Sequence, residues 1–367
     1  MKKETKYLYT SYKLLKARNN ATSSHTPITK QKLLFRLLIS TFLCFAPSIS
    51  NSENALIYPQ KQTSEISGIA AVNTSTFLAS HDQKKNEEMA FSIISISHIG
   101  KPIKQKYLPL TKEKKGILRD NIADLEAICK DTSSNFFYAF ESQNYNSTGG
   151  RVLKIELDSA TSKIHVVDAR RLPPGFSNTN KEGYNLEGAL CLGSNEFLIS
   201  DRESGKIFKT KWNKDTLFLE ATKLVSDGLS SEKLTGYNRK ISDLSLLGNV
   251  IIASAANDPE PKTPEKKDFG PFKSLIYKIG SIDNSGGIHL KGEIEILHHI
   301  NSYKAEAIEI TSRSVSTLYE KSTPYQILMG SDDEKLGGSI QIFALNIPLS
   351  VSFRKHSNSS RFDEGEP

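Results

Sequence analysis

The residues most able to do chemistry in this sequence are acids that recur along the chain at a near-constant spacing. One position of the pattern is acidic in four of five copies, and the copies are 59, 61, 56 and 63 residues apart, counted between Ser67, Glu126, Glu187, Asp243 and Glu306. A second acid follows after 14 or 15 residues in four copies and after 26 in the fifth, which gives Asp82, Glu141, Asp201, Asp258 and Asp332. An insertion at 311–324 accounts for the longer step.

Carboxylates gathered in one place repel one another unless a cation neutralises them. Oxygen ligands without paired Cys or His residues suit Ca²⁺, and suit Mg²⁺ less well. We therefore expect a calcium site whose ligands are drawn from the acids of both positions. The sequence leaves a structural alternative open, because an acid at a strand end can bond the backbone of the neighbouring repeat and hold the repeats together.

Basic residues stand just before four of the first acids, and these are Arg119, Lys181, Arg239, Lys240 and Lys304. Beside a bound metal they would bind an anionic substrate such as a phosphate ester, although solvated loop charges are the alternative. The candidate catalytic residues are Glu187 and His81, the latter as a general base beside Asp82. The sequence has no GxSxG, HExxH or phosphate-cradling glycine motif, which argues against serine and zinc hydrolases.

Short strands must position these residues. From Asn54 onward, apolar and β-branched residues form short runs broken by Gly, Asn, Ser, Asp and Pro, which is typical of strands. Each repeat holds a strand at the first acid, one ending at the second acid, a third, and in most copies a fourth. Four antiparallel strands at a fixed period predict an all-β fold, the β-propeller. In that fold the first strands line a central channel, so the acids would meet at one mouth.

The repeat count predicts five blades, with six possible if one blade is degenerate. An N-terminal strand at 55–59 is expected to pair with the last blade, because this pairing closes the ring and removes an exposed sheet edge. The predicted regions are a leader at 1–50, the propeller at 51–351 and a polar tail at 352–367.

The leader contains an apolar segment at 33–49 that follows a basic start and ends in small residues near Ser50. This layout is typical of a secretory signal, and the segment is shorter than the roughly 20 residues of a membrane span. It begins about 30 residues further into the chain than a signal usually does, which leaves an anchor or a buried helix as alternatives. We expect a cleaved signal and export to a periplasm or to the cell exterior, with no stable membrane span beyond this segment.

The overall charge and the cysteines exclude other classes. The net charge is +7 and the pI about 9.0, but part of the basic excess lies in the leader and no basic stripe follows, which argues against nucleic-acid binding. There is no CxxC pair among Cys44, Cys129 and Cys191. We interpret Cys129 and Cys191, which occupy matching strands, as small buried hydrophobic residues rather than as a disulfide.

The sequence resembles the phytase-like (esterase-like activity of phytase) family of secreted propellers and its SdiA-regulated relatives. The resemblance spans about 63–344 and rests on short motifs at Ile66–Ala70, Asp124–Ile128, Asn180–Ala189 and Ile241–Leu244. It implies an exported propeller with phosphoesterase or esterase activity, and calcium by similarity to β-propeller phytases. The sequence departs from the pattern where Ala follows Glu126 and Glu306, and where Ser67 replaces an acid.

The sequence thus predicts an exported β-propeller that binds Ca²⁺ and hydrolyses a phosphate or related ester at the channel mouth. The alternative is a non-catalytic envelope or extracellular propeller that binds a partner and whose acids are structural, because the fold hosts both kinds of protein.

Overall fold

The computed structural model describes twelve stretches of the chain, which are 61–63, 65–82, 87–96, 103–113, 115–118, 120–122, 124–141, 150–173, 184–258, 272–311, 325–332 and 338–345. The chain divides into two units, Met1–Glu53 and Asn54–Pro367, and every described residue belongs to the second. In those stretches no helix is long and apolar enough to cross a membrane. The leader, the tail and the expected strand at 55–59 lie outside the described residues.

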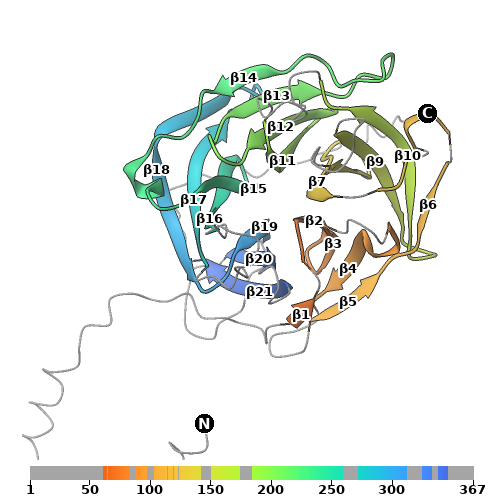
Figure 1. The fold of residues 1–367 in the computed structure, drawn as a ribbon, viewed down its shortest axis with the longest axis horizontal. Helices are drawn as coiled ribbons and strands as arrows, with labels where there is room; N and C mark the ends of the chain where they lie inside the picture. Colours follow the sequence, from red (N-terminus) through yellow and green to blue (C-terminus); the bar gives the residue numbers. More distant parts are fainter. Residues whose placement is uncertain are drawn as a thin grey trace, which may run out of the picture. The chain divides into compact units, whose positions relative to one another are not determined.

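Five sheets surround one axis, so the second unit is a five-bladed β-propeller, as the repeat count predicts (Figure 1). From the axis outward, blade 1 consists of β2 (Gly68–Asn73), β3 (Thr76–Ser80), β4 (Phe91–Ser95) and β5 (Lys104–Tyr107). Blade 2 consists of β7 (Leu125–Lys130), β8 (Phe136–Glu141), β9 (Arg151–Asp158), β10 (Lys163–Arg171) and β6 (Leu110–Lys112), which pairs parallel with β10 at the outer edge. The parallel fifth strand was not expected from the repeat.

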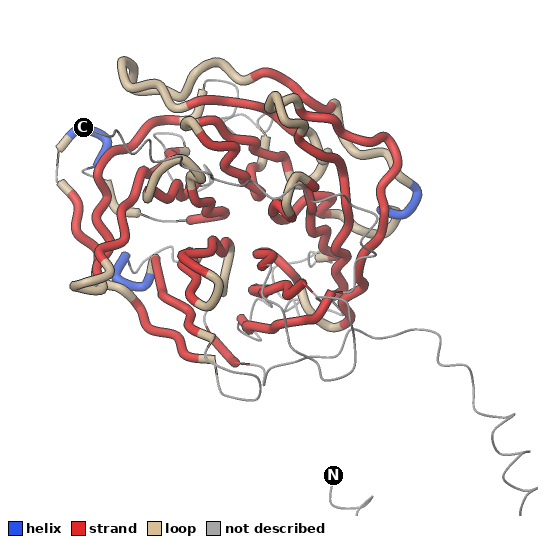
Figure 2. The backbone as a smooth tube through the Cα atoms, turned by 180° about the vertical axis from the view of Figure 1, so that it is seen from behind, coloured by secondary structure: helices blue, strands red, loops and turns tan. Residues whose placement is uncertain are grey.

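The remaining blades keep four strands each. Blade 3 consists of β11 (Leu186–Gly193), β12 (Glu196–Asp201), β13 (Ile207–Lys211) and β14 (Lys223–Ser226). Blade 4 consists of β15 (Arg239–Leu247), β16 (Val250–Asn257), β17 (Lys273–Ile282) and β18 (Ile288–Asn301). Blade 5 consists of β19 (Ala305–Thr311), β20 (Tyr325–Asp332), β21 (Gly338–Leu345) and β1 (Lys61–Thr63). Helix within the described residues is limited to short 3₁₀ turns at Glu87–Met89, Gly116–Leu118 and Glu232–Leu234 (Figure 2).

The ring is closed by a strand from the N-terminal side, as predicted, but a later segment forms it. β1 pairs antiparallel with β21, so that Lys61 faces Ile340 and Thr63 faces Gly338. This pairing covers the outer edge of blade 5 and joins the two ends of the propeller. The short polar sequence Lys-Gln-Thr has no strand signature of its own, so its partner strand decides its conformation.

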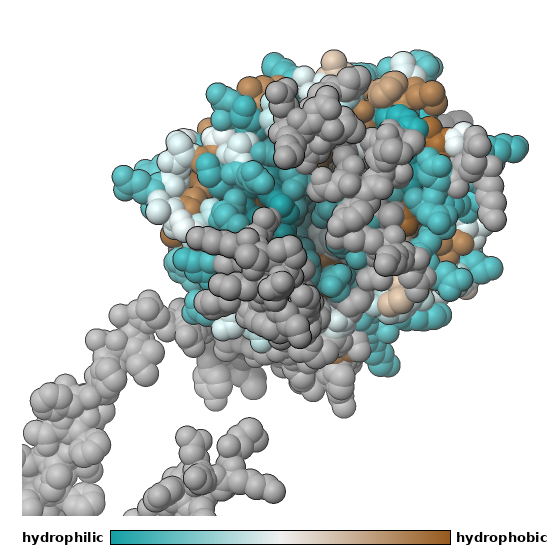
Figure 3. Space-filling model, viewed as in Figure 1, coloured by the Kyte–Doolittle hydropathy of each residue, from teal (hydrophilic) through white to brown (hydrophobic). Residues whose placement is uncertain are grey.

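The hydrophobic cores lie between neighbouring blades. One core packs Leu78 and Phe91 of blade 1 against Leu153 of blade 2, and four similar cores fill the other blade boundaries. The middle strands are therefore covered on both faces, as in β16, whose first seven residues are buried, whereas no residue of the outer strand β5 is buried. Figure 3 shows a largely hydrophilic face where atoms are coloured, with apolar residues in small scattered groups.

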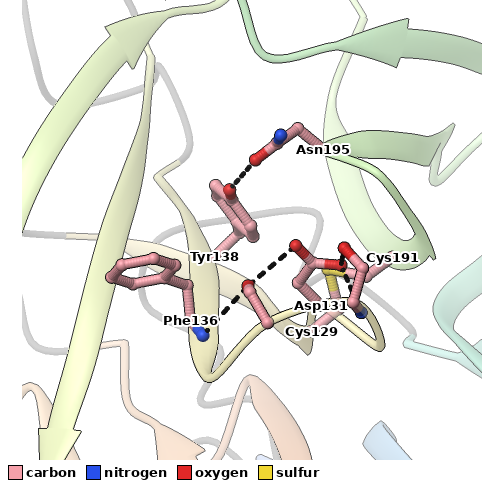
Figure 4. The surroundings of a disulfide bond; sticks show 8 residues. Cys129, Asp131, Phe136, Tyr138, Cys191 and Asn195 are labelled. Atoms are coloured by element: carbon pink, nitrogen blue, oxygen red, sulfur yellow. Dashed lines mark hydrogen bonds between the residues drawn. A yellow bond between two sulfur atoms is a disulfide. The ribbon is translucent and has the colours of Figure 1, made fainter. Parts of the chain in front are cut away.

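The interpretation of Cys129 and Cys191 as free cysteines is wrong, because the two form a disulfide. Cys129 lies on β7 and Cys191 on β11, the innermost strands of blades 2 and 3. Their Cα atoms are 5.5 Å apart, and the two residues are separated by 62 positions in sequence. Both side chains are buried. Figure 4 shows that Asp131 and Tyr138 of blade 2 lie beside the bond, and that Tyr138 donates a hydrogen bond to Asn195 of blade 3. Covalent and polar links thus join the two blades near the axis.

We expect the Cys129→Ala, Cys191→Ala double variant to lose about 2–4 kcal/mol of unfolding free energy, because the disulfide restricts the unfolded chain. Urea unfolding followed by circular dichroism measures the loss. Dithiothreitol should lower the stability of the wild type by a similar amount and leave the double variant unchanged. Coincident wild-type curves with and without reductant would show that the disulfide does not form in solution.

Candidate functional site

The five innermost strands all begin at the same end of the central channel, which we call the mouth. Ser67, Glu126, Glu187, Asp243 and Glu306 come from these strands or from the residue just before them, and the second acids come from the ends of the adjoining strands. Because adjoining strands are antiparallel, the predicted positions of each blade meet at this end, as the repeat indicated. Gly188 permits a close approach there, since a Cβ on it would lie 2.6 Å from Ser200 Oγ and 3.2 Å from the Asp243 backbone.

Three of the first acids sit at β-bulges, which the sequence did not reveal. The pairing skips Glu126 between Leu125 and Ala127, and the same skip occurs at Glu187 in β11 and at Glu306 in β19. A bulge leaves one residue unpaired and redirects its side chain, and bulges are common beside active sites. At each bulge, the acid therefore does not follow the regular alternation of side chains between the two faces of its strand.

Arg239 contacts acids of several blades at the mouth. Its guanidinium forms ion pairs with Glu187 of blade 3 at 3.4 Å, with Asp258 of its own blade at 2.5 Å, and with Glu306 of blade 5. Burial by itself would lower the pKa of Arg239, but Glu187, Glu306 and Asp258 raise it well above its ordinary value. Arg239 is therefore a permanently charged group whose donors are occupied by protein carboxylates.

Lys304 repeats this arrangement at the start of blade 5. Its ammonium is fully buried and lies 3.2 Å from Glu306, 3.3 Å from Asp332 and 3.5 Å from Asp258. Burial disfavours the charge, yet Glu306 and the other acids raise the pKa of Lys304 above its ordinary value. Burial alone would raise the pKa of Glu306. The positive charges of Lys304 and, to a smaller extent, Arg239 outweigh this effect and lower the pKa. Glu306 is therefore ionised at neutral pH.

Glu187 is bound by cations on both oxygens. Arg202, which directly follows the second acid Asp201, donates to Glu187 Oε1 at 2.9 Å, and Arg239 lies at Oε2. Arg202 also donates to Asn185 once the Asn185 amide is placed with its oxygen toward the guanidinium, at 3.0 and 3.2 Å. Burial still raises the pKa of Glu187, with Arg239 and Arg202 opposing it. Arg202 was missed in the sequence, although its place beside a repeated acid was a usable signal.

Glu126 differs from the other first acids. It is partly exposed, whereas Glu187, Asp243 and Glu306 are buried, and no residue of the described stretches bonds its carboxyl group. Burial raises its pKa well above 4.5, and Glu187, Asp124, Asp82 and Glu306 raise it further by repulsion. Glu126 and Glu187 line one narrow hollow between blades 2 and 3. Asp124, one of the acids that raise the pKa of Glu126, has a φ of 59°, in the left-handed region. Its effect on Glu126 was not predicted from the sequence.

The other predicted ligands have structural partners. Asp243 accepts from the Ile308 amide of blade 5 at 2.8 Å and from the Leu244 amide at 2.8 Å. Asp201 accepts from the Asn185 amide at 2.8 Å and the Ser204 amide at 2.9 Å. These bonds match the structural alternative, in which repeated acids hold strands and blades together.

Glu141 is also held within its own blade. Its carboxylate forms a two-pronged ion pair with the fully buried Arg151, which also donates to the carbonyl oxygens of Ile117 and Asn121 at 2.6 and 2.8 Å. Contacts of this kind on every donor face of a guanidinium compensate its burial. Glu141 and Arg151 therefore fix the loop that leads into β7.

His81 is likewise held inside blade 1. Its Nδ1 lies 2.7 Å from the carbonyl oxygen of Glu65, and its Nε2 lies 2.8 Å from Ser92 Oγ. The ring is fully buried, and burial lowers its pKa to about 4. A neutral imidazole with both nitrogens bonded inside the sheet favours a structural role over the predicted one as general base.

Of the predicted substrate-binding cations, Arg119 and Lys181 lie outside the described residues. Arg239 and Lys304 are engaged with acids, and Lys240 is half-buried beside Arg239, with its carbonyl accepting from Tyr277. Most of the acids predicted to bind the metal are likewise bonded to cationic side chains or to backbone amides. In the described stretches no three His, Cys, Asp or Glu side chains are placed to hold one metal ion. Calcium binding at the mouth therefore stays a prediction.

Comparison with known proteins finds matches in structure but none in sequence. No protein-family model and no curated protein sequence matches the chain. Among solved structures, a thermostable family-43 glycoside hydrolase is 9% identical, covering 81% of this chain and 93% of its own with a TM-score of 0.47. The soluble aldose sugar dehydrogenase of Escherichia coli is 9% identical, covering 78% and 99% with a TM-score of 0.39. The periplasmic gluconolactonase of Pseudomonas aeruginosa is 9% identical, covering 77% and 88% with a TM-score of 0.35. The propeller assignment rests on the strand pairing of this chain itself.

We expect Arg239→Met to cost about 3–5 kcal/mol of unfolding free energy, because it leaves Glu187, Asp258 and Glu306 buried without their shared cation. The neighbouring Lys240→Met is the matched control, since the described residues contain no ion-pair partner for Lys240, and it should cost less than about 1 kcal/mol. Chemical unfolding of the two variants measures both values. Equal losses would refute the central role of Arg239.

Proposed function

We propose that the mouth is a hydrolytic site that cleaves an ester, with Glu126 as proton donor and Glu187 as its ionised partner. The observation that carries the proposal is the isolation of Glu126, whose carboxyl group has no bond within the described residues and is surrounded by other acids. A carboxyl group held among other acids without a bonding partner costs stability. Proteins commonly keep such costly groups where function requires them.

The neighbouring charges assign a role to each carboxyl group. Two interacting acids titrate as a pair, and the shared proton resides on the member with fewer cationic neighbours. Glu187 has Arg239 and Arg202 at its two oxygens, whereas acids dominate the surroundings of Glu126. The proton therefore belongs on Glu126. A protonated and an ionised carboxyl side by side is the arrangement that general acid–base catalysis needs.

The proposed reaction is hydrolysis at the ester carbonyl. Glu187 takes a proton from a water molecule as the water oxygen bonds to the carbonyl carbon. Glu126 gives its proton to the leaving oxygen as the bond from carbon to that oxygen breaks. The products are a carboxylic acid and an alcohol, and exchange of one proton with solvent restores both carboxyl groups.

The charge of the mouth bears on the substrate. Arg239, Arg202 and Lys304 are paired with carboxylates, so an added phosphate would meet repulsion from Glu126 and its neighbours. An uncharged ester avoids this repulsion. A phosphate ester, as the resemblance to phytase-like propellers implies, would need a divalent cation such as Ca²⁺ to offset it. We therefore propose calcium only together with a phosphate ester as substrate. The substrate that we favour is an uncharged ester.

We also propose that the protein is exported. The disulfide between Cys129 and Cys191 supports this, because structural disulfides form in oxidising compartments and are rare in the cytosol. The signal-like segment at 33–49 points the same way, although it lies outside the described residues.

A non-catalytic binding propeller is the second candidate. The bonds of Asp243, Asp201 and Glu141 favour it, because each of these repeated acids serves the fold. The two candidates differ at Glu126. Neutralising an acid that bonds the fold lowers the stability of the protein. Neutralising a catalytic acid that has no such bonds lowers only the activity.

We expect Glu126→Gln to lower the hydrolysis of ethyl acetate, whose alkoxide leaving group needs a proton, by about 10²–10⁴-fold, the usual contribution of a general acid. Its unfolding free energy should stay equal or rise. Glu156→Gln, an exposed acid on β9 of the same blade, is the control and should keep full activity. The same series with 4-nitrophenyl phosphate, with Ca²⁺ or with a chelator, tests the calcium-dependent route. An inactive wild type on both substrates would favour the binding propeller.

The pH dependence gives a separate check. Burial and the surrounding acids raise the pKa of Glu126, so the rate should fall as pH rises through that raised pKa and the donor loses its proton. A group with a raised folded-state pKa contributes stability that is lost over the same rise. The unfolding free energy of the wild type, measured relative to Glu126→Gln, should therefore decrease above about pH 4.5. A difference that stays constant with pH would remove the assigned protonation.

A further inference from the structure

A second cavity lies on the same axis, beyond the mouth. Its volume is about 470 Å³, and all five innermost strands contribute to its wall. Each strand supplies a residue a few positions after its mouth residue, such as Ile128 after Glu126 and Glu309 after Glu306. The cavity shares no lining residue with the hollow that contains Glu126 and Glu187, so the two are separate. This volume falls within the roughly 300–1,000 Å³ of small-molecule sites.

The cavity wall combines apolar residues with polar ones, and Glu309 is one of its two carboxylates. Ile69, Ile128, Leu190 and Leu244 lie around it. Glu309 accepts from the Ala71 amide at 3.2 Å with Oε1 and from Ser245 Oγ at 3.3 Å with Oε2. A carboxylate offers about four acceptor positions, so these two bonds leave capacity for a ligand. The bonds also fix the carboxylate between blades 1 and 4.

The other charged groups of the cavity decide the sign of the ligand. Asp131 is buried, and its oxygens accept from Ser133 and from Ser134 at 2.8 Å each. Lys130 donates to the Val72 carbonyl at 3.0 Å and lies 5.7 Å from the centre of the Phe137 ring. Two acids against one lysine give the lining an excess negative charge. A cation therefore fits better than an anion.

We propose that this cavity is a second binding site, which takes a small molecule with an apolar or aromatic body and a cationic amine or amidine that bonds Glu309. The apolar residues cover the body, and the carboxylate receives charge-assisted hydrogen bonds from the head group. The site is independent of ester hydrolysis at the mouth, because it uses different residues of the same strands.

Isothermal titration calorimetry with 4-aminobenzamidine at pH 8 tests the proposal. We expect the wild type to bind it, and Glu309→Gln, which keeps the side-chain shape, to bind at least about tenfold more weakly. Glu126→Gln should bind as the wild type does. Benzamide, which has no positive charge, should bind weakly and equally to the wild type and to Glu309→Gln. Unchanged affinity in Glu309→Gln, or loss of affinity in Glu126→Gln, would overturn the assignment.

Titration of Glu309 provides a second measurement. Burial raises its pKa to about 7, with the Ala71 amide, Ser245 and Lys130 opposing the shift, and Asp243 is the acid that faces it from β15. Below that pH the carboxyl becomes neutral and loses its attraction for a cation. Affinity for 4-aminobenzamidine should therefore rise by about tenfold between pH 6 and pH 8 in the wild type. It should stay flat in Glu309→Gln, and equal affinity of the wild type at both pH values would contradict the site.

Discussion

The burial of Arg239 at the axis is the interaction on which the arrangement of the innermost strands depends. Its guanidinium joins carboxylates from three successive blades, namely Glu187, Asp258 and Glu306. A charge taken from water costs several kcal/mol unless partners surround it, so these strands can approach one another only while the cluster is complete. Lys304 extends the cluster to Asp332. The apolar cores between blades thus surround an axis that is held by ion pairs.

This cluster also makes the mouth asymmetric. Both of its buried cations come from blades 4 and 5, and the acids that they neutralise belong to blades 3, 4 and 5. On the side of blades 1 and 2, Asp82 and Asp124 act on Glu126 and raise its pKa. An even ring of acids would distribute a proton or cation over all blades. The asymmetry instead leaves Glu126 with fewer cationic neighbours than Glu187, which is the basis of the donor role proposed for it.

The sequence predicts the blades because a period near 60 residues survives in the order of strands and acids, whatever each acid does. It does not predict the partners across blades. Arg239 stands before its strand like the other basic residues, and only the folded ring brings it to Glu306, 67 residues away. Cys129 and Cys191 were misassigned for the same reason, since matching positions in neighbouring blades meet only after closure. The closing strand was placed too early because β1 has no apolar pattern.

Because the blades repeat, the same position of the repeat has different roles in different blades. The repeat places an acid in four of the five innermost strands, and each copy then takes the partners that its blade supplies. Asp243 bonds the backbone of the next blade, Glu306 binds Lys304, and Glu187 binds two arginines. Glu126 alone has no partner within the described residues, and nothing in its local sequence distinguishes it from the others. Its neighbours therefore provide the argument for function, because an acid that bonds its own fold is explained by stability and Glu126 is not.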